Sequence, residues 1–155
     1  MICYLCDNEN AMPLQRGSEA ILHYIKCPNC GEYIISEQAI TTHANKRDTR
    51  FIVAGEAFQL SYNRNEIKKI RISDFETSED IPTIEKLYHL ARYFYAETLK
   101  NGLCQKIKKL PRACCYAKND SEYLQLWELL KSKNIIELFG NLKFTNNFRL
   151  KTQNA

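Results

Sequence analysis

The chain has 155 residues, enough for one medium domain or two small ones, with the 45% apolar and 26% charged content of a globular protein. It has no apolar run of the ~18 residues that span a membrane, and its start, MICYLCDNENAMP, lacks the basic and apolar regions of a signal peptide. We therefore expect a protein of the reducing cytoplasm without a membrane partner, in which most of the seven cysteines are not in disulfides.

Two cysteine pairs open the chain, Cys3 with Cys6 and Cys27 with Cys30, separated by 20 residues. Two residues between ligands let one tight turn present both sulfurs to one ion, and this double spacing is typical of zinc sites. Disulfides, free thiols, a redox pair and an iron–sulfur cluster are the alternatives. Four cysteines fill a tetrahedral shell, so we expect one structural Zn²⁺ that supplies folding energy to a small unit.

The residues around these pairs predict a zinc ribbon over residues 1–36. The segment ILHYIK at 21–26 alternates as a strand does, RGS at 16–18 suits a hairpin turn, and EYII at 32–35 predicts a further strand. Gly31 and Asp7 directly follow the two pairs, where a knuckle turn requires a positive φ.

Residues 37–80 predict a helical connector and a linker strand. Ser36 is the expected N-cap of the first helix, and Phe51, Ala54 and Phe58 share a face further along. Residues 65–83 then alternate and become acidic up to Pro82, which we interpret as a boundary with a connecting strand.

Residues 81–155 predict a winged-helix-like domain. The clearest helix lies between Pro82 and Gly102. Its expected buried stripe is Ile84, Leu87, Tyr88, Ala91, Phe94, Tyr95 and Thr98. We expect this stripe to be core.

A strand at 105–110, a short helix opening at Pro111, a turn at Asn119–Asp120 and a helix to about Lys133 follow. The helix has a capping box formed by Asn119 and Glu122. Its predicted buried face is Tyr123, Leu126, Trp127 and Leu130. A β-hairpin around Gly140–Asn141 completes the order of a winged helix. The fold class expected for the whole chain is α+β.

Positive charge is concentrated in the second half of the chain. Residues 1–83 carry 9 Lys and Arg against 12 Asp and Glu, a balance of −3, whereas residues 84–155 carry 13 against 6, a balance of +7. A basic half suggests a nucleic-acid partner or an acidic protein, although a solvated surface explains it equally well. The candidate phosphate contacts are Lys106, Lys108, Lys109, Arg112 and Lys118, with Lys143 and Arg149 in the wing. Gln125 is the candidate base-reading residue.

The alternative function is a protein-docking adaptor or accessory subunit. The predicted recognition helix carries Asp120, Glu122 and Glu128, and carboxylates in a DNA groove would oppose phosphate. An enzyme is not expected, because there is no catalytic triad order, phosphate-binding glycine loop or acidic pair. Cys104, Cys114 and Cys115 are expected to be structural. Of the three scattered histidines, His23 lies on the ribbon strand, where it could substitute for a ligand, but the four cysteines already suffice.

The segments CPNCGEYII and ACCYAKNDSEYLQLWELLKSKNII together resemble a bacterial module. In that module an N-terminal four-cysteine zinc ribbon precedes a helical connector and a winged-helix-like segment. The resemblance covers most of the chain and implies a part in signalling or phage defence, where such modules precede an effector domain. The effector is then expected to be a separate polypeptide.

Overall fold

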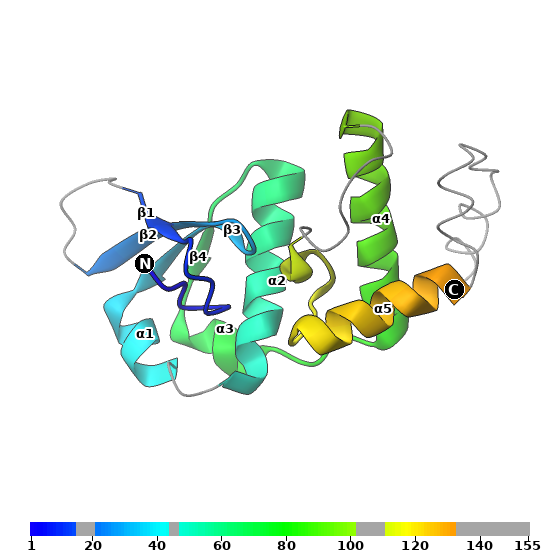
Figure 1. Ribbon diagram of the computed structural model, residues 1–155. Helices are drawn as coiled ribbons and strands as arrows, with labels where there is room; N and C mark the ends of the chain where they lie inside the picture. The colour runs from blue at the N-terminus through cyan, green and yellow to red at the C-terminus, as the bar shows by residue number, and fades with distance from the viewer. Residues whose placement is uncertain (15–20, 44–46, 102–110, 133–155) are drawn as a thin grey trace.

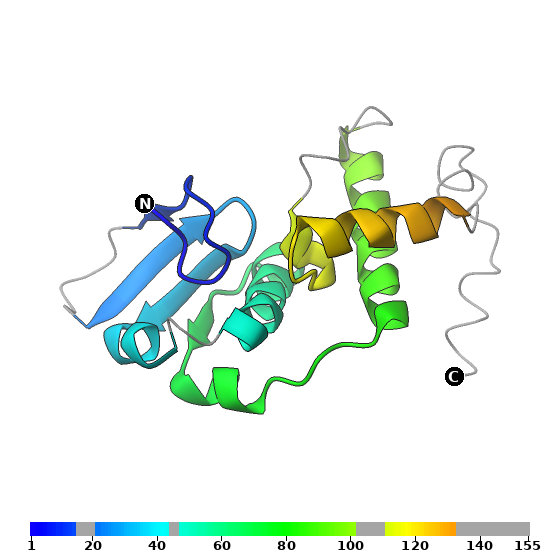
Figure 2. The same cartoon turned by 60° about the horizontal axis from the view of Figure 1, so that its bottom comes forward.

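A computed structural model of the protein describes residues 1–14, 21–43, 47–101 and 111–132. It is a mixed structure with a four-stranded sheet and several helices, which confirms the α+β class. The long helix α2 (Arg47–Arg64) lies between the sheet and a pair of crossing helices, α4 (Thr83–Asn101) and α5 (Asp120–Ser132), as Figures 1 and 2 show. Within the described residues, no helix combines the length and apolar character needed to cross a membrane.

The sheet has the strand order β1-β2-β3-β4. Its strands are β1 (Met12–Pro13), β2 (Leu22–Cys27), β3 (Gly31–Ser36) and β4 (Lys68–Ile70). The first three are antiparallel, whereas β4 pairs in parallel with β3. The strands expected at 21–26 and 32–35 are therefore confirmed. One face of the sheet carries Ile25, Tyr33 and Ile35 into the core, and the other is the open face.

The stretch 65–83 differs from the expectation of a simple connecting strand. Lys68–Ile70 is an edge strand of the sheet itself, and a short helix, α3 (Ile72–Thr77), follows it directly. The N–H of Arg71 donates to Asp74 Oδ2 at 2.6 Å, which fixes the start of α3. Ile70 of β4 and Phe75 of α3 are both buried, so this largely polar stretch contributes two apolar side chains to the core.

Helices α1 (Glu37–His43) and α2 pack beside and across the core face of the sheet. Ser36 caps α1 as predicted, because its Oγ accepts a hydrogen bond from the N–H of Ala39 at 3.1 Å. Phe51, Ala54 and Phe58 of α2 are all buried, in agreement with the predicted face.

Helix α4 has the predicted bounds and most of the predicted buried stripe. Ala91, Phe94 and Thr98 are buried as expected, and Leu87 and Tyr95 pack partly buried against the core. Ile84 is 75% exposed and Tyr88 is 40% exposed, so their assignment to the core was wrong, whereas Leu90, which was not assigned to the stripe, is fully buried. The helical period alone does not decide, to within about one residue, which side of α4 faces the core. Packing against α5 decides it here: the rings of Phe94 and Trp127 meet edge to face, with their centroids 5.1 Å apart.

The short helix predicted at Pro111 is a 3-10 turn, η2 (Arg112–Cys115), and α5 follows it. All four residues predicted for the buried face of α5 are buried. The capping box forms in part. Asn119 Oδ1 accepts from the N–H of Glu122 at 2.9 Å, but the Glu122 carboxylate accepts from the N–H of Lys118. The predicted turn at 16–18, strand at 105–110 and hairpin around Gly140 lie outside the described residues.

One continuous set of buried side chains connects the cysteine-rich start of the chain to α5. It contains Cys3 and Cys30, the sheet residues Ile25 and Tyr33, and Trp127. The metal-ligand candidates are therefore packed into the same core as the C-terminal helices, with α2 and η2 between them.

Candidate functional site

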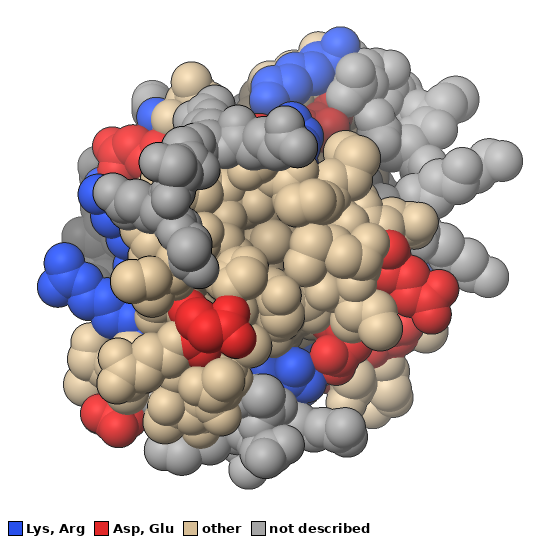
Figure 3. Space-filling model, turned by 90° about the vertical axis from the view of Figure 1, so that its left-hand side faces the viewer, with Lys and Arg blue, Asp and Glu red and all other residues tan. Residues whose placement is uncertain are grey.

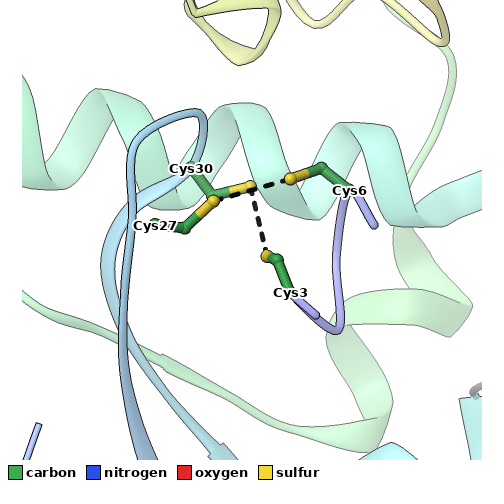
Figure 4. Close-up of side chains that lie close together, drawn as sticks. All are labelled: Cys3, Cys6, Cys27 and Cys30. Atoms are coloured by element: carbon green, nitrogen blue, oxygen red, sulfur yellow. Dashed lines mark hydrogen bonds between the residues drawn. The ribbon is translucent and has the colours of Figure 1, made fainter. Parts of the chain in front are cut away.

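Four buried sulfurs meet between the start of the chain and the β2–β3 turn. Cys3, Cys6, Cys27 and Cys30 place their sulfurs within 4.8 Å of one another. Figure 4 shows all four side chains converging on one point. The distances from Cys3 to Cys30 and from Cys6 to Cys27 are 3.8 and 3.6 Å, too long for disulfides. A tetrahedron with Zn–S bonds of about 2.3 Å has edges of about 3.8 Å, so the donor set fits one Zn²⁺.

The two backbone turns have the geometry expected of metal knuckles. Asp7 follows Cys6 with φ of 58°, and Gly31 follows Cys30 with φ of 74°. Both residues were singled out from the sequence for this reason. A Cβ at Gly31 would lie 2.7 Å from Ser61 Cβ, so close packing against α2 adds a second requirement for glycine there.

Hydrogen bonds to the sulfurs come from Tyr33 and Asn29. The Tyr33 hydroxyl lies 3.1 Å from Cys3 Sγ, and burial raises its pKa, so it remains a phenol that can donate to a thiolate. Asn29 donates its backbone N–H to Cys27 Sγ at 3.4 Å and its amide group to Cys30 Sγ at 3.9 Å. Such contacts orient metal ligands and stabilise their charge.

The four thiols differ in their preference for ionisation. Hydrogen bonds from Cys27, Cys30 and Cys6 lower the pKa of Cys3, whereas burial raises the pKa of Cys30. Binding of Zn²⁺ by all four cysteines would displace the remaining thiol protons.

Two arginines hold the first knuckle against the helical part of the molecule. Arg50 of α2 donates to both carboxylate oxygens of Asp7, at 3.1 and 2.9 Å, and to the carbonyl of Tyr4. Arg112 of η2 donates to the carbonyl of Cys6 at 2.9 Å. The Asn29 side chain adds a third link, because its Oδ1 accepts from the buried N–H of Ala113 at 3.1 Å. The metal centre is thereby tied to both α2 and η2.

The remaining cysteines and histidines in the described residues form no second cluster of this kind. Cys114 and Cys115 are buried in η2, and burial raises the pKa of Cys114, which disfavours a reactive thiolate. His23 pairs with Glu37 at the start of α1 rather than with the sulfurs.

The predicted nucleic-acid contacts that the structure describes are Arg112, Lys118 and Gln125. Besides Cys6, Arg112 contacts Asp120 at 3.0 Å, and Lys118 contacts Asp80 at 3.0 Å. Gln125 lies on the exposed face of α5. The other candidates, Lys106, Lys108, Lys109, Lys143 and Arg149, lie outside the described residues.

Lys86 of α4 is a buried cation that sequence reasoning did not identify. Its side chain is 3% exposed and contacts Glu122 at 2.9 Å and Asp80 at 3.1 Å. Burial alone would lower its pKa, but the two carboxylates outweigh burial and raise it. These ion pairs connect α4 with α5 and with the segment before α4. Glu122 therefore pairs with a buried cation of the protein itself.

The sequence also did not predict a groove of about 580 Å³ on the open face of the sheet. Tyr24 of β2, Ile34 of β3 and Lys69 of β4 lie side by side in the sheet register, and Arg71 follows β4. The described residues that line the groove include no aspartate or glutamate. The alternation in LHYIK predicts that Tyr24 lies on the face away from the core. Only the pairing of β4 with β3 brings the two cations to the groove that Tyr24 lines.

Comparisons with protein-family models, with curated proteins and with solved structures find no match to this chain.

Proposed function

We propose that this is a non-enzymatic nucleic-acid-binding protein with a structural zinc ion, whose phosphate-binding surface includes the groove on the open face of the sheet. The observation that carries the proposal is the pair Lys69 and Arg71 in that groove. Both are exposed, and among the described residues neither side chain has a carboxylate partner. Exposed cations without an internal partner are available to phosphate groups.

The surroundings of these two cations support the assignment. The nearby Asp74 is already engaged by Lys68 at 3.2 Å, and Glu32 on the same face pairs with Lys26 at 2.9 Å. By contrast, Arg112 and Lys118 each contact an aspartate. The zinc ion would support this surface indirectly. Cys27 is the last residue of β2 and Cys30 directly precedes β3, so a bound ion would fix the turn between the two strands.

The test is a salt titration of nucleic-acid binding with charge-matched variants. Two phosphate contacts contribute about −1.4 to the slope of log K against log salt on a single strand. The variant Lys69→Gln/Arg71→Gln should therefore bind more weakly and with a slope less steep by about that amount. The control, Arg92→Gln/Lys131→Gln on α4 and α5, removes the same charge away from the groove and should bind like the wild type.

Two results would overturn this proposal. One is undetectable binding of any nucleic acid even at low salt. The other is weaker nucleic-acid binding by the control variant alone. That result would place the interface on α4 and α5 and favour the winged-helix arrangement predicted from the sequence.

A second candidate function is protein docking through α5. Its outer face exposes Leu124 by 49% and Leu129 by 41% and also carries the acidic Asp120 and Glu128. Such a face fits an apolar partner helix with basic flanks. It would be favoured if nucleic acid failed to bind and a purified partner formed a complex that Leu124→Asp abolished.

A further inference from the structure

We propose that the sheet groove recognises single-stranded nucleic acid by stacking an unpaired base on Tyr24, with the flanking phosphates held by Lys69 and Arg71. This inference rests on the proposed function and names the class of nucleic acid that the site takes. It assigns the base contact to the sheet, not to α5.

The position of Tyr24 carries the inference. Tyr24 is half-buried, lies directly opposite Ile34 across β2 and β3, and lines the groove. Ile34 is 7% exposed although it points to the open face, so it forms an apolar floor beside the ring. Lys69 continues the same row on β4. An aromatic ring, an apolar floor and a cation in one row can hold a base and its phosphate together.

The polar residues at one end of the groove add hydrogen-bonding capacity. Gln38 of α1 is exposed, lines the groove and can donate to or accept from a base edge. Ser73 lies at the same end beside Arg71. Neither side chain has a hydrogen-bond partner among the described residues. The groove thus offers a stacking surface, an amide and two cations.

The dimensions and the charge favour a single strand over a duplex. About 580 Å³ is within the ~300–1,000 Å³ range of sites for small organic ligands, which suits an extruded nucleotide. In a duplex the base faces are stacked on one another and cannot contact Tyr24. Figure 3 views the molecule from the end that carries the sheet in Figure 1 and shows basic and acidic residues in small separate groups around a mostly uncharged area, not as one continuous basic surface. With few phosphate contacts, base stacking has to provide much of the affinity.

The experiment measures binding of fluorescein-labelled oligo(dT), oligo(U) and a DNA hairpin duplex to the zinc-loaded protein by anisotropy. We expect both single strands to bind more tightly than the duplex. Tyr24→Phe keeps the ring and should bind like the wild type, whereas Tyr24→Leu should weaken single-strand binding roughly 5- to 100-fold and leave duplex binding unchanged. Circular dichroism and zinc content should be equal in the three proteins, since the residue is on the open face.

The outcomes separate this inference from the function on which it rests. Equal binding of single strands and duplex, or equal binding by the Phe and Leu variants, would overturn base stacking while the effect of Lys69→Gln/Arg71→Gln still supported phosphate binding. The mononucleotide UMP is also tested, as a competitor of the labelled oligomers. If UMP competed as strongly as the oligomer, the site would be a nucleotide pocket and the single-strand assignment would be wrong. No binding of any probe would remove the proposed function itself.

Discussion

At the scale of single residues, the four-cysteine cluster is supported by side chains that are not candidate ligands. Tyr33 donates to Cys3, and Asn29 contacts two sulfurs while it holds the N–H of Ala113. The sequence identified the four cysteines by spacing. It did not identify Tyr33 and Asn29, because their roles depend on tertiary contacts. Tyr33 reaches Cys3 only when β3 packs against the first knuckle, and Asn29 reaches Ala113 only when η2 packs against the second knuckle.

Replacement of Tyr33 tests this role. Tyr33→Phe keeps the ring in the core but removes the hydrogen-bond donor from Cys3, so the thiolate loses a stabilising contact. We expect zinc affinity to fall about 10- to 100-fold, as measured by competition with a chelator of known affinity. Tyr24→Phe removes a hydroxyl from the open face and should leave zinc affinity unchanged. Equal affinities in both variants would show that the Tyr33 hydroxyl does not support the site.

At the scale of elements, α2 and the residue after η2 approach each other closely at a glycine. A Cβ built on Gly55 would lie 2.2 Å from the ring of Tyr116, which follows η2 with φ of 56°. Glycine within a helix costs about 0.5–1 kcal/mol relative to alanine, so its presence indicates a packing requirement. The sequence alone shows Gly55 in a helical pattern without showing what approaches it.

Replacing Gly55 with alanine should therefore destabilise the protein, although alanine has the higher helix propensity. Gly55→Ala favours the helix but drives the new methyl group into the Tyr116 ring, so we expect a net loss of about 1–3 kcal/mol in the free energy of unfolding. Asn63→Ala, at an exposed position on the same helix, is the control; it removes a hydrogen bond to Gln59 but creates no clash, so it should cost less than about 1 kcal/mol. Urea denaturation measures both. A stabilised Gly55→Ala protein would contradict the close approach.

At the scale of the whole molecule, the sequence predicts that zinc supplies folding energy to the small N-terminal unit, so that residues 81–155 would fold without the metal. The continuous core changes this expectation. Cys3, Cys30 and Trp127 belong to one set of buried side chains, and Arg112 and Ala113 bond directly to the two knuckles.

Removal of zinc should accordingly affect the entire protein. We expect chelation, or the variant Cys27→Ser, to change Trp127 fluorescence and helical circular dichroism in a single transition, because the loss of one part exposes the core of the other. Cys115→Ala removes a buried thiol outside the metal cluster and should retain one zinc per chain. Native Trp127 fluorescence after complete zinc removal would show that the C-terminal helices fold independently.

The sequence by itself determined the four-cysteine cluster, the knuckle turns at Asp7 and Gly31, the strands β2 and β3, and the buried face of α5. These features follow from local spacing, backbone preference and periodicity, which operate over a few residues. The tertiary structure decided the phase of α4, the place of Lys68–Ile70 in the sheet, the burial of Lys86 and the groove beside Tyr24. Each of these depends on which distant segment packs alongside. Tyr24 and Lys69 flank Ile34 in one row of the sheet only because β4 adds in parallel to β3.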